Sequence, residues 1–291
     1  ITDPVVASVP SISHNSSAHL LFYPVKIMDT STLEHLQNHF AAYCARFHTT
    51  DRDVARNIEL KRLHCMKVSD ESRRLAESLE LDAGNIHLAT AIGLFHDIGR
   101  FEQYHRYNTF VDAHSINHAE LGREIIEQSD LPSRLRQKEK EIFLDAVSWH
   151  NRPFLPDCSD QRKLQFARIV RDADKIDIFR VVTEYYETAD HAEKNRAIQL
   201  DLPDTPACSP DVLGALLGGK PVMATTIKTL NDFKLLQLGW VFDCNFPHTL
   251  DEIKERKYIE KIIRVLPETP EITRIREKIT CYLDEIGRAH V

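Results

Sequence analysis

The segment Leu94-Phe95-His96-Asp97-Ile98-Gly99 places a histidine and an aspartate between apolar neighbours. A carboxylate is normally kept out of apolar surroundings unless it is paired or bound to a metal ion. Imidazole and carboxylate together suit divalent transition metals, and an adjacent His-Asp pair can give a nitrogen to one ion and a bridging oxygen to another. More side chains of these types lie before and after the segment, at His64, His118, His150 and Asp174.

The chain around this segment is predicted to be almost entirely helical. From Thr30 onward, apolar residues recur at three- and four-residue spacings, only 9 of 291 residues are glycine, and alternating strand patterns are short. Ser31 is suited to cap the first helix, and Gly99 is suited to end the helix with the His-Asp pair. We expect helices at about 31–48, 51–79, 85–98, 115–128, 138–150, 160–188, 224–240, 248–265 and 270–286.

Breaks in this pattern indicate the domain organisation. Residues 1–27 have no helical period, so we read them as a non-native or disordered leader before Met28, and 287–291 can be read in the same way. The polar and aromatic loop predicted at 100–112 should overhang the His-Asp pair. The proline-rich stretch 201–210 separates a metal-binding helical domain, 28–200, from a C-terminal helical extension, 201–291, that packs on this core.

Composition excludes some functional classes. A net charge of −7 argues against general binding of nucleic acid or anionic membranes. No run of about 18 apolar residues predicts a transmembrane helix. The 6 cysteines are scattered without a Cys-x-x-Cys pair, which is typical of reduced thiols in the cytosol. A hydrophobic fraction of 42% is enough for a large buried core.

In order and spacing, these histidines and aspartates resemble the ligands of the HD-domain superfamily of metal-dependent phosphohydrolases. The resemblance covers roughly residues 55 to 185 and implies an all-α HD-domain helical bundle followed by additional C-terminal helices. Members with two extra histidines hold two ions. By this resemblance, His64, His96, Asp97 and Asp174 bind one ion, and Asp97, His118 and His150 bind the other. Iron or manganese is expected, and zinc, cobalt or nickel could substitute.

The third histidine has an alternative, because His114 stands four residues before His118 and would share a helix face with it. In the family this histidine is followed by a small residue and then by a glycine, a pattern that His118-Ala119-Glu120-Leu121-Gly122 fits. We therefore choose His118 and expect His114, like His105, to face substrate or to lie at the surface.

Other charged residues near the ligands are candidates for substrate contact. Asp97 is expected to be catalytic as the bridging ligand, with Lys175 and Arg100 as catalytic cations and Arg180 as a further phosphate contact. A plain surface position is the alternative for each of the three cations. Asp172 and Asp177 are expected to pair with neighbouring basic residues on a solvated face.

The resemblance implies a cytoplasmic enzyme that cleaves a small-molecule phosphomonoester or phosphodiester, a nucleotide included. Two ions would lower the pKa of a bridging water so that hydroxide is available near neutral pH. The alternative is an HD-fold di-iron oxygenase acting on a polyol or phosphonate. A binding module with a degenerate site is disfavoured because no ligand position is lost. The sequence leaves the oligomeric state open, and a homo-oligomer is compatible with it.

Overall fold

The computed structural model describes residues 28–188, 195–200 and 202–289, and it confirms the all-α prediction. The described residues contain helices and no strand. The leader predicted at residues 1–27 lies outside this described part. Among the described residues, no helix is long and apolar enough to cross a membrane.

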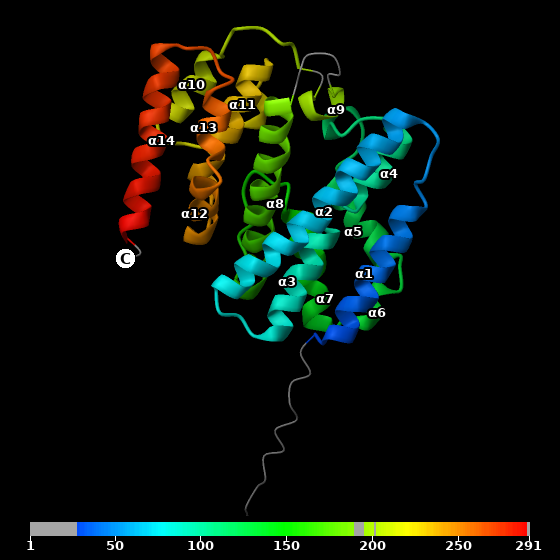
Figure 1. Ribbon diagram of the computed structural model, residues 1–291. Helices are drawn as coiled ribbons and strands as arrows, with labels where there is room; N and C mark the ends of the chain where they lie inside the picture. Colours follow the sequence, from blue (N-terminus) through cyan, green and yellow to red (C-terminus); the bar gives the residue numbers. More distant parts are fainter. Residues whose placement is uncertain (1–27, 189–194, 201, 290–291) are drawn as a thin grey trace, which may run out of the picture.

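The first half of the chain forms one group of helices, which in Figure 1 lies on one side of the long helix α8 (Gln161–Thr188). α2 packs against both α3 and α8, α7 packs against α8, and α5 packs against α4 and α7. The helices of this group are α1 (Thr30–Ala45), α2 (Arg52–Ser78), α3 (Ala83–Phe95), α4 (Gly99–Tyr107), η1 (Asp112–His114), α5 (His118–Glu127), α6 (Leu131–Arg134) and α7 (Gln137–Trp149).

Most of the second half packs on the other side of α8, whereas α9 (Arg196–Gln199) lies on the side of α4, as Figure 1 shows. Its helices are α9 (Arg196–Gln199), α10 (Pro210–Leu217), η2 (Ala224–Thr226), α11 (Leu230–Gly239), η3 (Trp240–Asp243), α12 (Pro247–Glu255), α13 (Tyr258–Ile263) and α14 (Pro270–Ala289).

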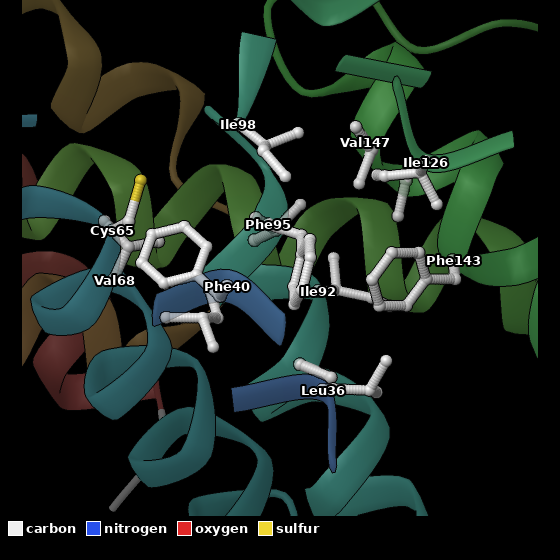
Figure 2. Close-up of a cluster of buried hydrophobic side chains, with 14 of the residues drawn as sticks. Leu36, Phe40, Cys65, Val68, Ile92, Phe95, Ile98, Ile126, Phe143 and Val147 are labelled. Atoms are coloured by element: carbon white, nitrogen blue, oxygen red, sulfur yellow. The ribbon is translucent and has the colours of Figure 1, made fainter. Parts of the chain in front are cut away.

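Two apolar cores meet along α8. Phe166 and Val170 on its first half belong to the core of α1–α7, whereas Phe179 and Val182 on its second half belong to the core of the C-terminal helices. Figure 2 shows part of the first core, where side chains from α1, α2, α3, α5 and α7 pack together. Burial of this apolar surface is the main favourable contribution to folding.

The helix boundaries differ from the expectations in several places. Asp29, not Ser31, caps α1 by accepting a hydrogen bond from the Thr32 backbone. The predicted helix 248–265 is two helices, with Lys257 between them at a φ of 56°. The stretch predicted as a break ends in a short helix, α10, which begins at Pro210. Proline is well suited to such a first position because it has no amide hydrogen to leave unpaired.

The largest difference concerns the segment after the His-Asp pair. The predicted loop 100–112 is mostly helix, since α4 begins at Gly99 and continues to Tyr107. Gly99 therefore does not end a helix in the left-handed conformation. Its role is steric, because a Cβ at this position would lie 2.1 Å from the His118 carbonyl oxygen and 2.7 Å from the Gly122 amide nitrogen. The missing side chain allows the starts of α4 and α5 to touch.

Substitution of Gly99 by alanine should therefore be strongly destabilising. The contacting atoms are backbone on α5 and cannot turn away, so we expect Gly99→Ala to lower the free energy of unfolding by about 3 kcal/mol or more. Urea denaturation of the metal-free protein measures this. The control is Gly214→Ala in α10, where a Cβ meets nothing within 4 Å, and the expected change is a gain of about 0.5–1 kcal/mol. Equal stability of the two variants would contradict this account of the α4–α5 contact.

Candidate metal centre

The fold brings all six candidate ligands together at one place. His64 lies on α2, His96 and Asp97 form the turn between α3 and α4, and the other three come from α5, the end of α7 and α8. The four histidines and Asp97 are each no more than 6% exposed, while the Asp174 side chain is 19% exposed. The cluster is therefore reached by solvent along the side of Asp174.

One group of ligand atoms comes from His64, His96 and Asp174, whose ligand atoms lie close enough to share an ion. The Nε2 atoms of His64 and His96 are 3.2 Å apart. Asp174 Oδ1 lies 3.1 Å from His64 Nε2 and 3.6 Å from His96 Nε2. Although the first distance suits a hydrogen bond, its direction does not, since this buried oxygen has no hydrogen-bond partner.

A second group of ligand atoms, from His118 and His150, faces Oδ1 of Asp97. Asp97 Oδ1 lies 3.2 Å from His118 Nε2 and 3.5 Å from His150 Nε2, and these two nitrogens are 3.1 Å apart. Asp97 Oδ2 points to the first group, at 3.6 Å from His64 Nε2 and 3.7 Å from His96 Nε2. The two carboxylate oxygens therefore face different histidine pairs.

In each of the four candidate ligand histidines, Nδ1 lies within hydrogen-bonding distance of an acceptor. Backbone carbonyls accept from Nδ1 of His96 (Gly93 O, 2.8 Å) and of His150 (Val147 O, 2.7 Å). Because a carbonyl only accepts, these two rings must carry hydrogen on Nδ1, and a neutral ring then has its lone pair on Nε2. This is the arrangement typical of metal-binding histidines.

Carboxylates play the same part for the remaining two histidines. His64 Nδ1 lies 2.7 Å from Asp177 Oδ2, and His118 Nδ1 lies 2.8 Å from both oxygens of Asp112. The Nε2 atoms of the four histidines thus converge on the carboxylates of Asp97 and Asp174, and Oδ1 of each carboxylate lacks a hydrogen-bond partner. Cations would satisfy these atoms, so the donor set fits metal ions.

The surroundings keep two of the histidines neutral and Asp97 ionised. Burial lowers the pKa of His118 to about 3 and also lowers that of His96, which keeps both rings neutral and able to bind metal. Burial alone would raise the pKa of Asp97, but the Lys61 ammonium, 2.7 Å from Oδ2, leads a set of charges that hold it well below its usual value. Asp97 is therefore ionised.

His64 is the exception. Burial and the charge of Lys61 act to lower its pKa, but the carboxylates of Asp174 and Asp177 outweigh them and raise the pKa to about 9. In the metal-free protein this ring is therefore protonated at neutral pH. An ion that binds its Nε2 must displace a proton.

Two of the predicted substrate contacts lie elsewhere. Lys175, expected to be a catalytic cation, binds Asp243 at the end of η3, with Nζ 2.8 Å from the backbone oxygen and 2.9 Å from Oδ2. These contacts engage the Lys175 ammonium within the protein, and its role as a catalytic cation stays a prediction. His105 is exposed and packs edge-on against Phe47.

Three others lie next to the centre. Arg100 Nε is 3.4 Å from Asp97 Oδ1, while its Nη1 donates to Asp112 and to the Phe110 carbonyl. Arg180 pairs with Asp177 at 2.7 Å, behind His64. His114 is exposed in η1, two residues after Asp112.

Asp172 and Asp177 do pair with the basic residues Lys175 and Arg180, but the solvated face expected for them is wrong, because both are buried. Asp177 orients His64. Asp172 accepts hydrogen bonds from the backbone of Asn245 and Phe246 and from the Thr249 hydroxyl, at the start of α12. These contacts join the C-terminal helices to α8 two residues before Asp174.

Sequence reasoning missed Lys61 and Asp112. A signal existed for Lys61, since it precedes His64 by three residues and must share its helix face. For Asp112 no comparable signal existed, because the helical course of α4 and η1 determines where it meets His118.

The model of the HD domain family matches residues 63–178, a range that includes all six ligands. The chain therefore contains an HD domain, and its buried cluster of histidine and aspartate side chains is consistent with a metal site. Searches of curated proteins and of solved structures gave no match.

Substitution of His118 should remove one metal ion per chain, whereas substitution of His114 should remove none. His118→Ala deletes a buried nitrogen donor, and His114→Ala deletes an exposed side chain outside the cluster. Metal analysis after dialysis measures the difference, and circular dichroism checks folding. The reverse result would show that the third histidine was chosen wrongly.

Metal affinity should rise with pH between pH 6 and 8. Because His64 holds a proton below about pH 9, one proton leaves for each ion bound there, and the affinity should rise about tenfold per pH unit. Titration calorimetry in buffers of different ionisation enthalpy measures the released proton. Asp177→Asn removes one of the carboxylates that raise this pKa, so its pH dependence should be shallower. A flat dependence in the unmodified protein would contradict the argument.

Proposed function

We propose that this protein hydrolyses a small phosphomonoester or phosphodiester, a nucleotide included, at a centre of two metal ions. The observation that supports this most directly is the position of Asp97. Its Oδ2 faces His64 and His96, its Oδ1 faces His118 and His150, and each oxygen is within 3.7 Å of its two nitrogens. A carboxylate so placed is suited to bridge two ions.

The residues divide into two ligand sets with this shared carboxylate. His64, His96 and Asp174 would hold one ion with Asp97 Oδ2, and His118 and His150 would hold the other with Asp97 Oδ1. When bound, such ions lower the pKa of water and neutralise charge on phosphoryl oxygens. Mixed nitrogen and carboxylate ligands suit iron or manganese, and zinc, cobalt and nickel are also compatible.

The protein's own part is to keep the ligands rigid. Asp112 accepts from His118 Nδ1 and is itself held by Arg100 and by the amide of Gln103, at 3.0 Å and 2.8 Å. Asp177 has the same relation to His64 and is held by Arg180. Loss of such outer partners typically lowers metal affinity or activity about 10- to 100-fold. Buried, pre-oriented ligands of this kind favour hydrolysis near neutral pH.

The site suits a small molecule, because the cluster is buried and Asp174 is the one of its six ligands that is more than 6% exposed. A cytoplasmic location is also part of the proposal. It is supported by Cys44, Cys65, Cys158, Cys208 and Cys244, which are free thiols, as expected in a reducing compartment.

Manganese-loaded protein under anaerobic conditions should release the alcohol from p-nitrophenyl phosphate, bis-p-nitrophenyl phosphate or a nucleotide. Asp97→Ala should lower the rate by more than about 100-fold and remove at least half of the bound metal, because both ions share this ligand. Asp70→Ala, on an exposed part of α2, is the matched control and should behave like the unmodified protein.

The opposite pattern would favour the oxygenase. Manganese-loaded protein would then be inactive on all phosphoesters tested, and iron-loaded protein would consume dioxygen with a polyol or phosphonate. Full metal content and full rate in Asp97→Ala would instead rule out the shared carboxylate.

A further inference from the structure

Lys61 is a cation at the edge of the metal centre. It lies on α2 three residues before His64, and its Nζ is 2.7 Å from Asp97 Oδ2. The same Nζ lies 5.3 Å from the ring centroid of Phe110, a contact that favours a cation over an aromatic face. Its side chain is 18% exposed, close to the 19% of Asp174. The ammonium is thus held beside the centre while still in contact with solvent.

The cations expected from the sequence to bind phosphate are directed largely to other groups. Arg100 donates to Asp112 and to backbone between α4 and η1. Lys175 binds Asp243, and Arg180 pairs with Asp177. These donors bind groups of the protein itself, and Arg100 Nε, which has no hydrogen-bond partner, is buried next to Asp97.

Lys61 differs from them in the donors it has left. An ammonium carries three N–H groups. Among the hydrogen bonds of the described residues, Lys61 makes one, to Asp97. The remaining N–H groups can bind an anion that reaches the centre from solvent.

We infer that Lys61 binds a non-bridging phosphoryl oxygen of the substrate and is a catalytic residue, an inference that rests on the proposed function. In the hydrolysis, a bond forms from the water oxygen to phosphorus, the bond to the alcohol oxygen breaks, and a proton from water ends on the alcohol. Negative charge is spread over the phosphoryl oxygens during this exchange. A fixed ammonium hydrogen-bonded to one of them stabilises that charge.

The alternative role for Lys61 is purely structural. The ammonium would then serve only to neutralise Asp97 and hold it in place. The two roles predict different losses, because a structural counter-ion affects metal binding, whereas a substrate contact affects phosphate binding at constant metal content.

The test uses manganese-loaded protein and inorganic phosphate as the probe. Lys61→Met keeps the length and apolar stem of the side chain but removes its charge. It should retain the metal content of the unmodified protein and bind orthophosphate about 10- to 100-fold more weakly, as expected for a lost charge-assisted hydrogen bond. Lys61→Arg should recover most of this affinity. Lys67→Met, on the exposed face of the same helix, is the control and should match the unmodified protein.

Two results with Lys61→Met would overturn the inference. One is orthophosphate binding by Lys61→Met that equals the unmodified protein, and the other is loss of metal from Lys61→Met while Lys67→Met keeps it. Absence of orthophosphate binding by the unmodified protein would also overturn it. Lys61-dependent phosphate binding without cleavage of any phosphoester would refute the proposed hydrolysis but leave the phosphate contact of Lys61 in place.

Discussion

The buried carboxylate of Asp97 is the constraint on which the rest of the structure depends. An ionised group that is 3% exposed is costly unless opposite charge or hydrogen-bond donors surround it. Here four imidazoles, Lys61 and Arg100 lie within 3.7 Å of its two oxygens. The helices that supply these groups are those that form the first apolar core, so the centre and the fold are stabilised by the same packing.

Close backbone approach makes this arrangement possible. A Cβ on Gly93 would lie 2.7 Å from the Val68 carbonyl oxygen, so the absence of one lets α3 approach α2 near His64. Gly99 has the same effect for α4 and α5. The C-terminal helices add a further connection, since Arg171 donates to the His150 carbonyl and pairs with Asp243. The region after residue 200 is therefore connected through Arg171 to the backbone of a candidate ligand.

The sequence was sufficient for what depends on local pattern and residue type. Helical periodicity located most helices, and the order of histidines and aspartates located six side chains that the fold brings together. The part of the fold that each side chain faces could not be predicted in this way. Four residues, Asp172, Asp174, Lys175 and Asp177, lie within five positions of one another, yet they face the C-terminal helices or the candidate metal centre according to the packing of α8. Asp177 looked like a surface residue because its partner His64 is distant in the chain.

The central claim is that one carboxylate links two metal ions. Electron paramagnetic resonance of protein loaded with increasing manganese tests it most directly, since ions bridged by a carboxylate are magnetically coupled. The account predicts two ions per chain and a coupled signal that Asp97→Ala abolishes. Saturation at one ion per chain, or two ions with only uncoupled signals, would contradict it.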